Sequence, residues 1–301
     1  MSPDRLAGAI LARRRLLQGA GAMALLSLPV PAIADSPKIV SLDYGLASTL
    51  LSLGIVPAAV ASLADWGKWV IEPAMPESVI DLGSSWEINL EILTALKPDL
   101  ILTTPYLDAS LPRLQGVGKV LRLETYRPDG GAILPSVIAA TRRLAAEIGR
   151  EAEAERFLAK ADAFFDECRA RLARRPRPSL ALVNFMDARH VRIFGAPGLY
   201  DAVLTRIGLA NAWTGAANYW GFEIVGIETL AQITDPDALL IAFEPVPGDV
   251  LPKLARSPLW QALPFARPGH FAVLPGALLF GMVNEAMRFA RLMTARLEES
   301  A

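Results

Sequence analysis

The sequence predicts an α/β fold of two lobes, each with a mainly parallel sheet flanked by helices, joined by one long rigid helix. Three observations support this prediction. Residues 151–175 form an uninterrupted helical pattern, strand and helix signals alternate on both sides of it, and one helix–turn–strand unit occurs in each half. Alternating strands and helices are typical of parallel sheets. A surface helix inside one large domain is the alternative for residues 151–175.

The long helix is predicted from its apolar spacing and from the absence of helix breakers. Apolar side chains recur at intervals of three and four, at Phe157, Ala161, Phe164, Phe165, Cys168 and Leu172. Glutamates occupy the first turns and arginines the last, which complements the helix dipole. Pro176 ends the pattern. We therefore divide the chain into an export signal (1–34), an N-terminal α/β lobe (35–148), a linking helix (149–176) and a C-terminal α/β lobe (177–301).

Residues 1–34 have the composition of an export signal. Arg13 and Arg14 form a twin arginine before an apolar run, and the segment ends in an A-x-A cleavage site at 32–34. The twin arginine favours the route that exports folded proteins. No cysteine lies near the cleavage site, so we expect a soluble periplasmic protein that begins at Asp35 and has no lipid anchor.

Charge and cysteine content restrict the partners. The 30 basic and 31 acidic residues nearly balance, and the signal holds four of the basic residues against one acidic residue. A net acidic remainder argues against nucleic acid or an anionic membrane surface as partner. Cys168 is the only cysteine, so no intrachain disulfide forms, and its place on the apolar stripe predicts a packing role.

The lobes are predicted from short apolar runs separated by helical segments and turns. In the N-terminal lobe, strands are expected at 38–43, 55–61, 79–82, 100–103 and 120–123, and helices at 47–53, 90–96 and 133–148. In the C-terminal lobe, strands are expected at 180–185, 191–194, 238–242 and 271–274, and helices at 200–207 and 282–297.

One helix–turn–strand unit occurs in both halves. Residues 89–102 and 226–240 each begin a short helix with an apolar residue and a glutamate, pass through a Pro-Asp turn and end in an apolar strand. Glu91 and Glu228 occupy equivalent positions in the two copies. The repeat predicts two lobes of like design related by pseudo-symmetry. Chance similarity of two such units is the alternative.

Sequence signals of catalysis are mostly absent. The chain has no G-x-S-x-G motif and no P-loop. His190 and His270 are the only histidines, and with one cysteine they offer no ligand set at metal spacing. We therefore expect neither an enzyme nor a metal site made by protein side chains.

Aromatic residues in predicted loops are the positive signal for a binding site. They follow strands or lie in irregular segments, at Trp66, Trp69, Trp86, Tyr106, Trp213, Tyr219 and Trp220. Loops beyond strand ends are where α/β proteins bind ligands. A cleft lined by tryptophan and tyrosine suits a bulky, partly apolar ligand, although some of these rings are expected in the lobe cores.

Several segments, taken in order, carry a resemblance to a known family. They include Trp69-Val70-Ile71-Glu72-Pro73, Ser78-Val79-Ile80-Asp81-Leu82-Gly83, Asp187-Ala188-Arg189-His190, Asn218-Tyr219-Trp220-Gly221 and residues 258–265. The chain resembles the periplasmic binding proteins for ferric hydroxamate siderophores. The resemblance implies two α/β lobes joined by one long helix and no catalysis. It also implies a monomer that carries a ferric siderophore to an ABC permease at the inner membrane, without a cofactor, since the iron lies inside the siderophore.

The resemblance implies a set of site residues as well. The expected ligand-binding residues are Tyr44, Trp69, Ser85, Trp86, Tyr106, Trp213, Trp220 and Phe280. Ser85 takes the place of a family arginine that reaches the iron–hydroxamate oxygens, and Trp86 adds a ring beside it. The site is therefore expected to suit a different siderophore or chelate. Glu91 and Glu228 are expected to dock on the two permease subunits.

Three other functions stay open on the sequence. A binder of another metal-organic ligand, such as haem or a corrinoid, would use the same fold, and haem would demand an axial histidine or tyrosine. An enzyme would need a nucleophile–base pair or a metal set. A receptor-coupled sensor would be revealed by its signalling partner.

Overall fold

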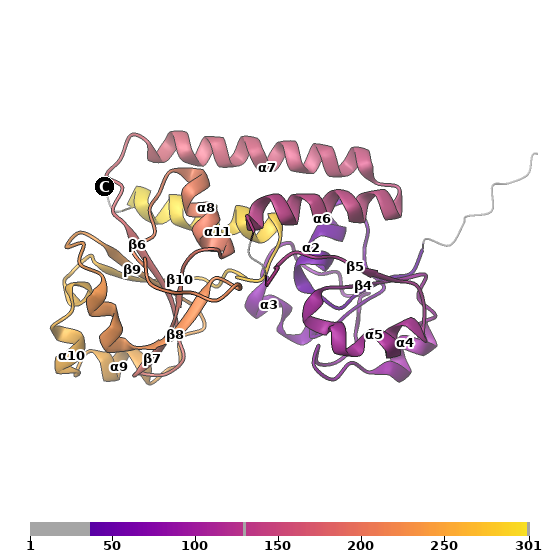
Figure 1. The fold of residues 1–301 in the computed structure, drawn as a ribbon, viewed down its shortest axis with the longest axis horizontal. Coiled ribbons are helices and arrows are strands. Elements are labelled where there is room, and N and C mark those ends of the chain that lie inside the picture. The colour runs from indigo at the N-terminus through magenta and orange to yellow at the C-terminus, as the bar shows by residue number, and fades with distance from the viewer. Residues whose placement is uncertain (1–36, 129–130, 300–301) are drawn as a thin grey trace, which may run out of the picture. The chain divides into compact units, whose positions relative to one another are not determined.

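Two α/β lobes joined by a long helix form the described part of the protein (Figure 1). The computed structural model describes residues 37–128 and 131–299. The predicted export signal, residues 1–34, lies outside the described residues. Among the described residues, no helix combines the length and apolar character that crossing a membrane requires.

The N-terminal sheet is parallel, as predicted. Its strands are β1 (Ile39–Ser41), β2 (Ala59–Val60), β3 (Ile80–Asp81), β4 (Leu100–Thr103) and β5 (Val120–Arg122), in the order β3-β2-β1-β4-β5. The α-helices of this lobe are α2 (Tyr44–Ser52), α3 (Trp66–Trp69), α4 (Leu90–Leu96), α5 (Leu111–Gln115) and α6 (Ile133–Ile148), and the 3-10 helices are η2 (Leu63–Asp65) and η3 (Pro105–Ser110). α2 begins at Tyr44, three residues before the predicted start, because Asp43 caps it. The Asp43 carboxylate accepts the Leu46 N–H at 3.0 Å.

The linking helix is α7 (Glu151–Leu172), whose 22 residues span about 33 Å. Its fully buried side chains follow one stripe, Ala154, Leu158, Ala161, Phe165, Cys168 and Leu172. Phe157 and Phe164, which the predicted stripe included, are half-buried at its edge. The packing role expected for Cys168 is confirmed, since its thiol is buried in the core.

The C-terminal sheet is mixed, which the sequence did not predict. Its strands are β6 (Leu180–Phe185), β7 (His190–Phe194), β8 (Phe222–Gly226), β9 (Leu239–Phe243) and β10 (Phe271–Leu274), in the order β10-β9-β6-β7-β8. β6 and β7 pair antiparallel, because their connection at 186–189 is too short for a parallel crossover. β7 and β8 also pair antiparallel, although the connection between them contains α8. The sequence analysis did not predict the edge strand β8. Its side chains are partly or fully exposed, so it lacks a buried apolar run of the kind that marks β9.

The remaining elements complete the C-terminal lobe. They are α8 (Leu199–Ile207), η4 (Ile227–Gln232), α9 (Val250–Leu254), α10 (Pro258–Gln261), η5 (Pro264–Ala266) and α11 (Val283–Glu299).

The two copies of the repeat occupy equivalent places in the two sheets. In the N-terminal lobe, α4 leads into β4, which lies between β1 and β5. In the C-terminal lobe, η4 leads into β9, which lies between β6 and β10. All four of these pairings are parallel. The predicted like design therefore holds for this half of each sheet, while β2 and β3 have no parallel counterpart in the pair β7 and β8.

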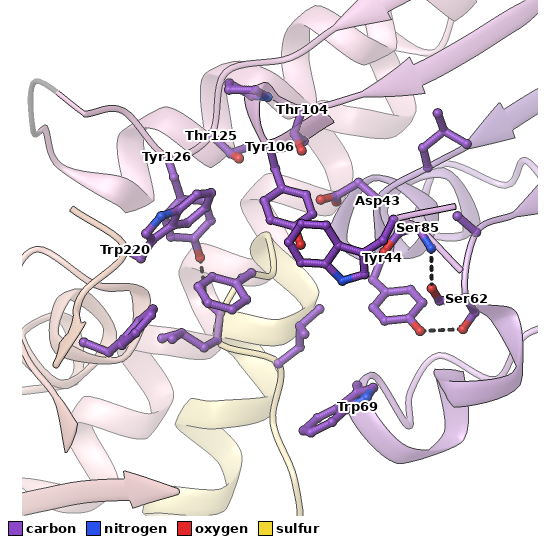
Figure 2. Close-up of a pocket in the computed structure, with 18 of the residues that line it drawn as sticks. Asp43, Tyr44, Ser62, Trp69, Ser85, Thr104, Tyr106, Thr125, Tyr126 and Trp220 are labelled. Atoms are coloured by element: carbon purple, nitrogen blue, oxygen red, sulfur yellow. Dashed lines mark hydrogen bonds between the residues drawn. The ribbon is translucent and has the colours of Figure 1, made fainter. Parts of the chain in front are cut away.

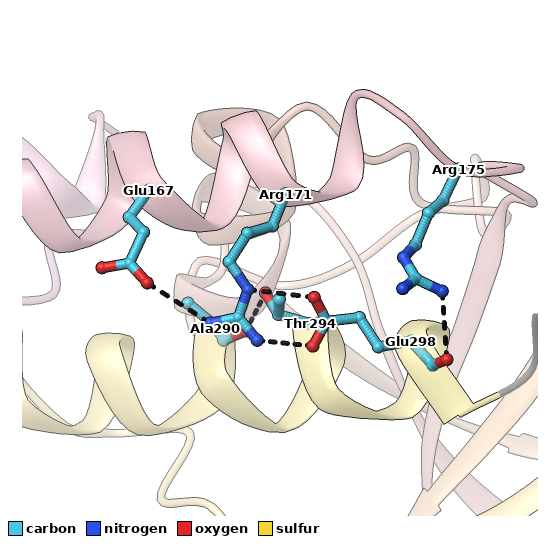
Figure 3. Close-up of polar contacts among 6 residues, drawn as sticks. All are labelled: Glu167, Arg171, Arg175, Ala290, Thr294 and Glu298. Atoms are coloured by element: carbon cyan, nitrogen blue, oxygen red, sulfur yellow. Dashed lines mark hydrogen bonds and ion pairs between the residues drawn. The ribbon is translucent and has the colours of Figure 1, made fainter.

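α11 and α7 pack side by side and connect the cores of the two lobes. A single apolar cluster runs from Leu46 of α2 to Tyr200 of α8, whose ring stacks on Phe289 of α11 at 4.3 Å. Polar contacts connect the C-terminal ends of α7 and α11 (Figure 3). Arg171 donates to the Glu298 carboxylate, with Nε 3.0 Å from Oε1. Residues of α7 and α11 thus belong to one apolar core that the two lobes share.

Candidate functional site

A cavity of about 450 Å³ lies between the two sheets and is lined by both lobes (Figure 2). One wall consists of segments that follow the carboxyl ends of the five N-terminal strands, and includes Asp43, Tyr44, Ser62, Ser85, Trp86, Thr104, Tyr106, Thr125 and Tyr126. The other wall comes from β6, β7, the turn before β8, β8 itself and the segment after β10, and includes Asn184, Arg192, Trp220, Phe222 and residues 277–280. Carboxyl ends of parallel strands are the usual ligand position in α/β proteins.

Aromatic rings form a connected set across the pocket. Trp86 and Tyr106 of the N-terminal wall lie 4.6 Å apart between ring centroids. Tyr106 reaches Trp220 of the C-terminal lobe at 6.2 Å, and Trp220 reaches Tyr126 at 5.2 Å and Phe280 at 5.3 Å. Trp86 remains 78% exposed, so its ring is free to cover a ligand. Such a lining binds a bulky ligand with apolar faces.

Tyr44, Ser62 and Ser85 connect the start of α2 with two loops of the N-terminal wall (Figure 2). The Tyr44 hydroxyl donates to the Ser62 carbonyl, and the Ser85 N–H donates to Ser62 Oγ at 2.9 Å. Ser62 has φ of 55°, in the left-handed region, a conformation that costs free energy in a residue other than glycine. Burial raises the pKa of Tyr44 to about 12, so the hydroxyl stays protonated and keeps its donor role.

Trp69 enters the pocket from α3 on a segment that α11 holds in place. Ile71 follows with φ of 68°, an uncommon conformation for a β-branched residue. The Glu72 carboxylate then accepts from Arg288 of α11 at 2.6 Å and also binds Arg291. Because Arg288 is only 8% exposed, this ion pair is well placed to restrain the Trp69 segment.

Two charged residues line the described pocket, one from each lobe. Asp43 caps α2, and burial raises the pKa of its carboxyl to about 6, although the Leu46 and Gly45 N–H groups favour the ionised form. Arg192 lies on β7 opposite Asn184 of β6. The rest of the lining is aromatic, aliphatic or neutral and polar.

The structure brings together seven of the eight expected ligand-binding residues, all except Trp213. Tyr44, Trp69, Ser85, Trp86, Tyr106, Trp220 and Phe280 line the cavity. Trp213 is 7% exposed and packs in the second core of the C-terminal lobe, where its Nε1 donates to the Ala216 carbonyl at 3.2 Å. The prediction that Trp213 lines the cleft is therefore wrong. Its ring lies over Gly195 and Gly215, where any Cβ would clash with it.

Sequence reasoning missed several lining residues, and one of them left a signal. Tyr126 lies in the segment after β5, Asn184 near the end of β6 and Phe222 at the start of β8, and none of them has a distinguishing sequence pattern. Arg192, by contrast, is a charged residue between the apolar Val191 and Ile193 of a predicted strand. A charge in that position indicates a strand face that meets something other than an apolar core.

The two glutamates predicted to dock on the permease and the two histidines lie outside this pocket. Glu91 and Glu228 are exposed in the first turns of α4 and η4. His190 contacts the Asp187 carboxylate with Nδ1 at 3.0 Å in the β6–β7 turn. Among residues 37–128 and 131–299, no group of three or more His, Cys, Asp or Glu side chains is arranged to hold a metal ion.

Comparisons with known proteins agree with this architecture. The sequence profile of the periplasmic binding protein family matches residues 39–278. The iron(3+)-hydroxamate-binding protein FhuD of Escherichia coli K12 is 33% identical over 289 residues, which cover 94% of this chain and 96% of that protein. The Fe(3+)-citrate-binding protein YfmC of Bacillus subtilis 168 is 22% identical, over 79% of this chain and 73% of its own length.

Among solved structures, the siderophore-binding protein FhuD of Vibrio cholerae, with Fe3+–Desferal bound, has the same fold. It superposes with a TM-score of 0.82 at 27% sequence identity, covering 88% of this chain and 99% of that one.

Proposed function

Because this chain belongs to the periplasmic binding protein family, we propose that it captures a ferric siderophore between its lobes and delivers it to an ABC importer. The hydroxamate type is favoured, since the E. coli relative binds iron(3+)-hydroxamate and the Vibrio structure holds Fe3+–Desferal. The iron is cargo, carried inside the chelate.

The observation that carries the proposal is the aromatic lining contributed by both lobes. Trp86 and Tyr106 on one wall and Trp220 and Phe280 on the other surround a cavity of about 450 Å³. A ferric hydroxamate presents methylene chains around a compact polar centre, which suits aromatic faces with a few polar groups between them. We assign ligand contact to Tyr44, Trp69, Ser85, Trp86, Tyr106, Trp220 and Phe280.

A titration panel tests the ligand class. Purified protein is titrated with ferric desferrioxamine B, ferrichrome, ferric citrate, haem and a corrinoid, while tryptophan fluorescence is recorded. Iron-free desferrioxamine and the gallium complex serve as controls for quenching by iron itself. We expect saturable binding of at least one ferric hydroxamate. Saturation by haem or the corrinoid alone would replace the proposal with the second ligand class.

We also assign residues 1–34 to twin-arginine export and the mature protein to the periplasm, with Asp35 as its first residue. The assignment is supported by Arg13 and Arg14, the apolar run and the A-x-A site at 32–34. A form without a lipid anchor is part of this proposal, since Cys168 is the only cysteine in the chain and is buried on α7.

A further inference from the structure

Arg192 faces the pocket from a paired stretch of the C-terminal sheet. Alternation along β7 directs Val191 and Ile193, both fully buried, into the second core of the lobe, and Arg192 to the opposite face. Asn184 lies across the ladder from Arg192, and both line the cavity. The backbone of Arg192 is therefore fixed by regular sheet structure, with β6 on one side and β8 on the other.

The Arg192 side chain differs from the paired arginines of the molecule. Its Nε is shielded from solvent and has no hydrogen-bond partner in the described part of the chain. Its guanidinium carbon lies 4.6 Å from the centroid of the Phe222 ring, a cation–π contact. By comparison, Arg206 binds Asp162 at 2.7 Å and Arg122 binds Asp108 at 2.6 Å.

An unpaired guanidinium in this position needs a partner. Removing a cation from water without a counter-charge costs free energy, and burial lowers the pKa of Arg192 for that reason. Asp43, the carboxylate of the pocket, accepts the Leu46 N–H and caps α2 instead. The N–H groups of a guanidinium match the oxygen pairs of carboxylates and other chelating anions.

We propose that Arg192 binds an anionic oxygen group of the ligand and so selects ferric chelates that turn such oxygens toward the C-terminal wall. The inference rests on the proposed function and specifies its ligand further. The oxygens come either from a pendant carboxylate or from the hydroxamates around the iron. Arg192 is a specificity residue in this scheme, contributed by the lobe opposite Ser85.

Three ferric chelates with one hydroxamate core test the proposal. Desferrioxamine B ends in an ammonium group, its N-acetyl derivative is neutral, and its N-succinyl derivative ends in a carboxylate. In Arg192→Gln we expect affinity to fall by at least about tenfold, which corresponds to about 1.4 kcal/mol. A loss confined to the succinyl chelate identifies the pendant carboxylate as partner, and an equal loss for all three identifies the hydroxamate oxygens.

Two controls separate ligand contact from a structural role. Arg142→Gln removes the same charge from an exposed ion pair with Glu155 and should leave all three affinities unchanged. Ligand-free Arg192→Gln should unfold at the same temperature as the wild type or higher, because an unpaired charge is removed. Wild-type affinity of Arg192→Gln for every chelate, or a lowered unfolding temperature in that variant, overturns the proposal. If the wild type binds none of the three chelates, the proposed function fails first, and this inference with it.

Discussion

Trp220 connects aromatic rings of both lobes in the pocket. Its ring contacts Tyr106 and Tyr126 from the N-terminal wall and Phe280 from the segment after β10. Asn218 Oδ1 accepts the backbone N–H of Trp220 at 3.0 Å, which fixes the turn that carries this ring. A ligand held between the lobes can therefore contact this ring together with rings of both walls.

We predict that Trp220→Ala weakens binding of the ferric siderophore by more than about 1 kcal/mol, the contribution of one buried aromatic contact. The measurement is a fluorescence or calorimetric titration. Trp213→Phe is the matched control, because Trp213 packs in the core and should leave affinity unchanged when a ring is retained. Equal losses in both variants would mean that the pocket assignment is wrong.

The N-terminus of α11 depends on a buried carboxylate. Glu285 reaches back so that its Oε2 accepts the Met282 N–H at 2.7 Å, as in a capping box. Burial raises its pKa to about 7, and the nearby Asp43 contributes in the same direction. This helix end also follows directly on the segment 277–280 that lines the pocket.

We predict that Glu285→Gln makes stability less dependent on pH. Because the pKa of Glu285 is higher in the folded protein, the unfolded chain releases this proton first as the pH rises. The wild type should therefore lose stability between pH about 4.5 and about 7, by up to about 3 kcal/mol for this group. Glutamine keeps the acceptor for Met282 and cannot ionise.

Urea unfolding of both proteins at pH 5 and pH 8 measures this effect. Between pH 5 and pH 8, the wild type should lose more unfolding free energy than Glu285→Gln loses. Asp43 titrates in both proteins and therefore does not account for the difference. Parallel pH profiles would show that Glu285 does not titrate in this range.

The repeat places one exposed glutamate on each lobe, and we propose that both dock on the permease. Glu91 begins α4 and Glu228 begins η4, the helices that lead into the equivalent strands β4 and β9. A favourable interaction with its own helix dipole would explain each glutamate separately, at about 0.3 to 1 kcal/mol. Charge pairs at a transient interface mainly steer docking and set its register.

We predict that Glu91→Arg combined with Glu228→Arg leaves ligand affinity intact but abolishes uptake of labelled iron in cells with the cognate permease. Glu151→Arg is the matched control, since Glu151 is also exposed in the first turn of a helix, α7. Wild-type uptake by the double variant would contradict the docking role and leave the two glutamates only their interaction with the helix dipoles.

Export is the remaining property of the whole chain. We predict that replacing Arg13 and Arg14 by lysine leaves the precursor in the cytoplasm, because the twin-arginine route requires the pair. Cell fractionation and N-terminal sequencing measure the outcome, with Asp35 expected as the first residue of the wild-type mature protein. Arg5→Lys, outside the motif, is the control. Normal export of the double variant would contradict the assigned route.

Local patterns were enough to predict the linking helix, the repeat and most strands. The spacing of Ala161, Phe165 and Cys168 indicates α7 from side-chain order alone, since a helix is stabilised by neighbours three and four residues apart. Residues 89–102 and 226–240 were recognised in the same way. Aromatic loops pointed to a ligand site, and seven of the predicted residues line one pocket.

Contacts between residues far apart in the sequence could be identified only in the tertiary structure. Trp213 and Trp220 look alike in sequence, yet Trp213 packs over Gly195 and Gly215, while Trp220 meets rings of the opposite lobe. The antiparallel β8 and the exposure of Arg192 to the pocket likewise depend on strand pairing across the C-terminal sheet. Periodicity encodes which face of an element is apolar, but the packing partner of that face is set by residues far along the chain.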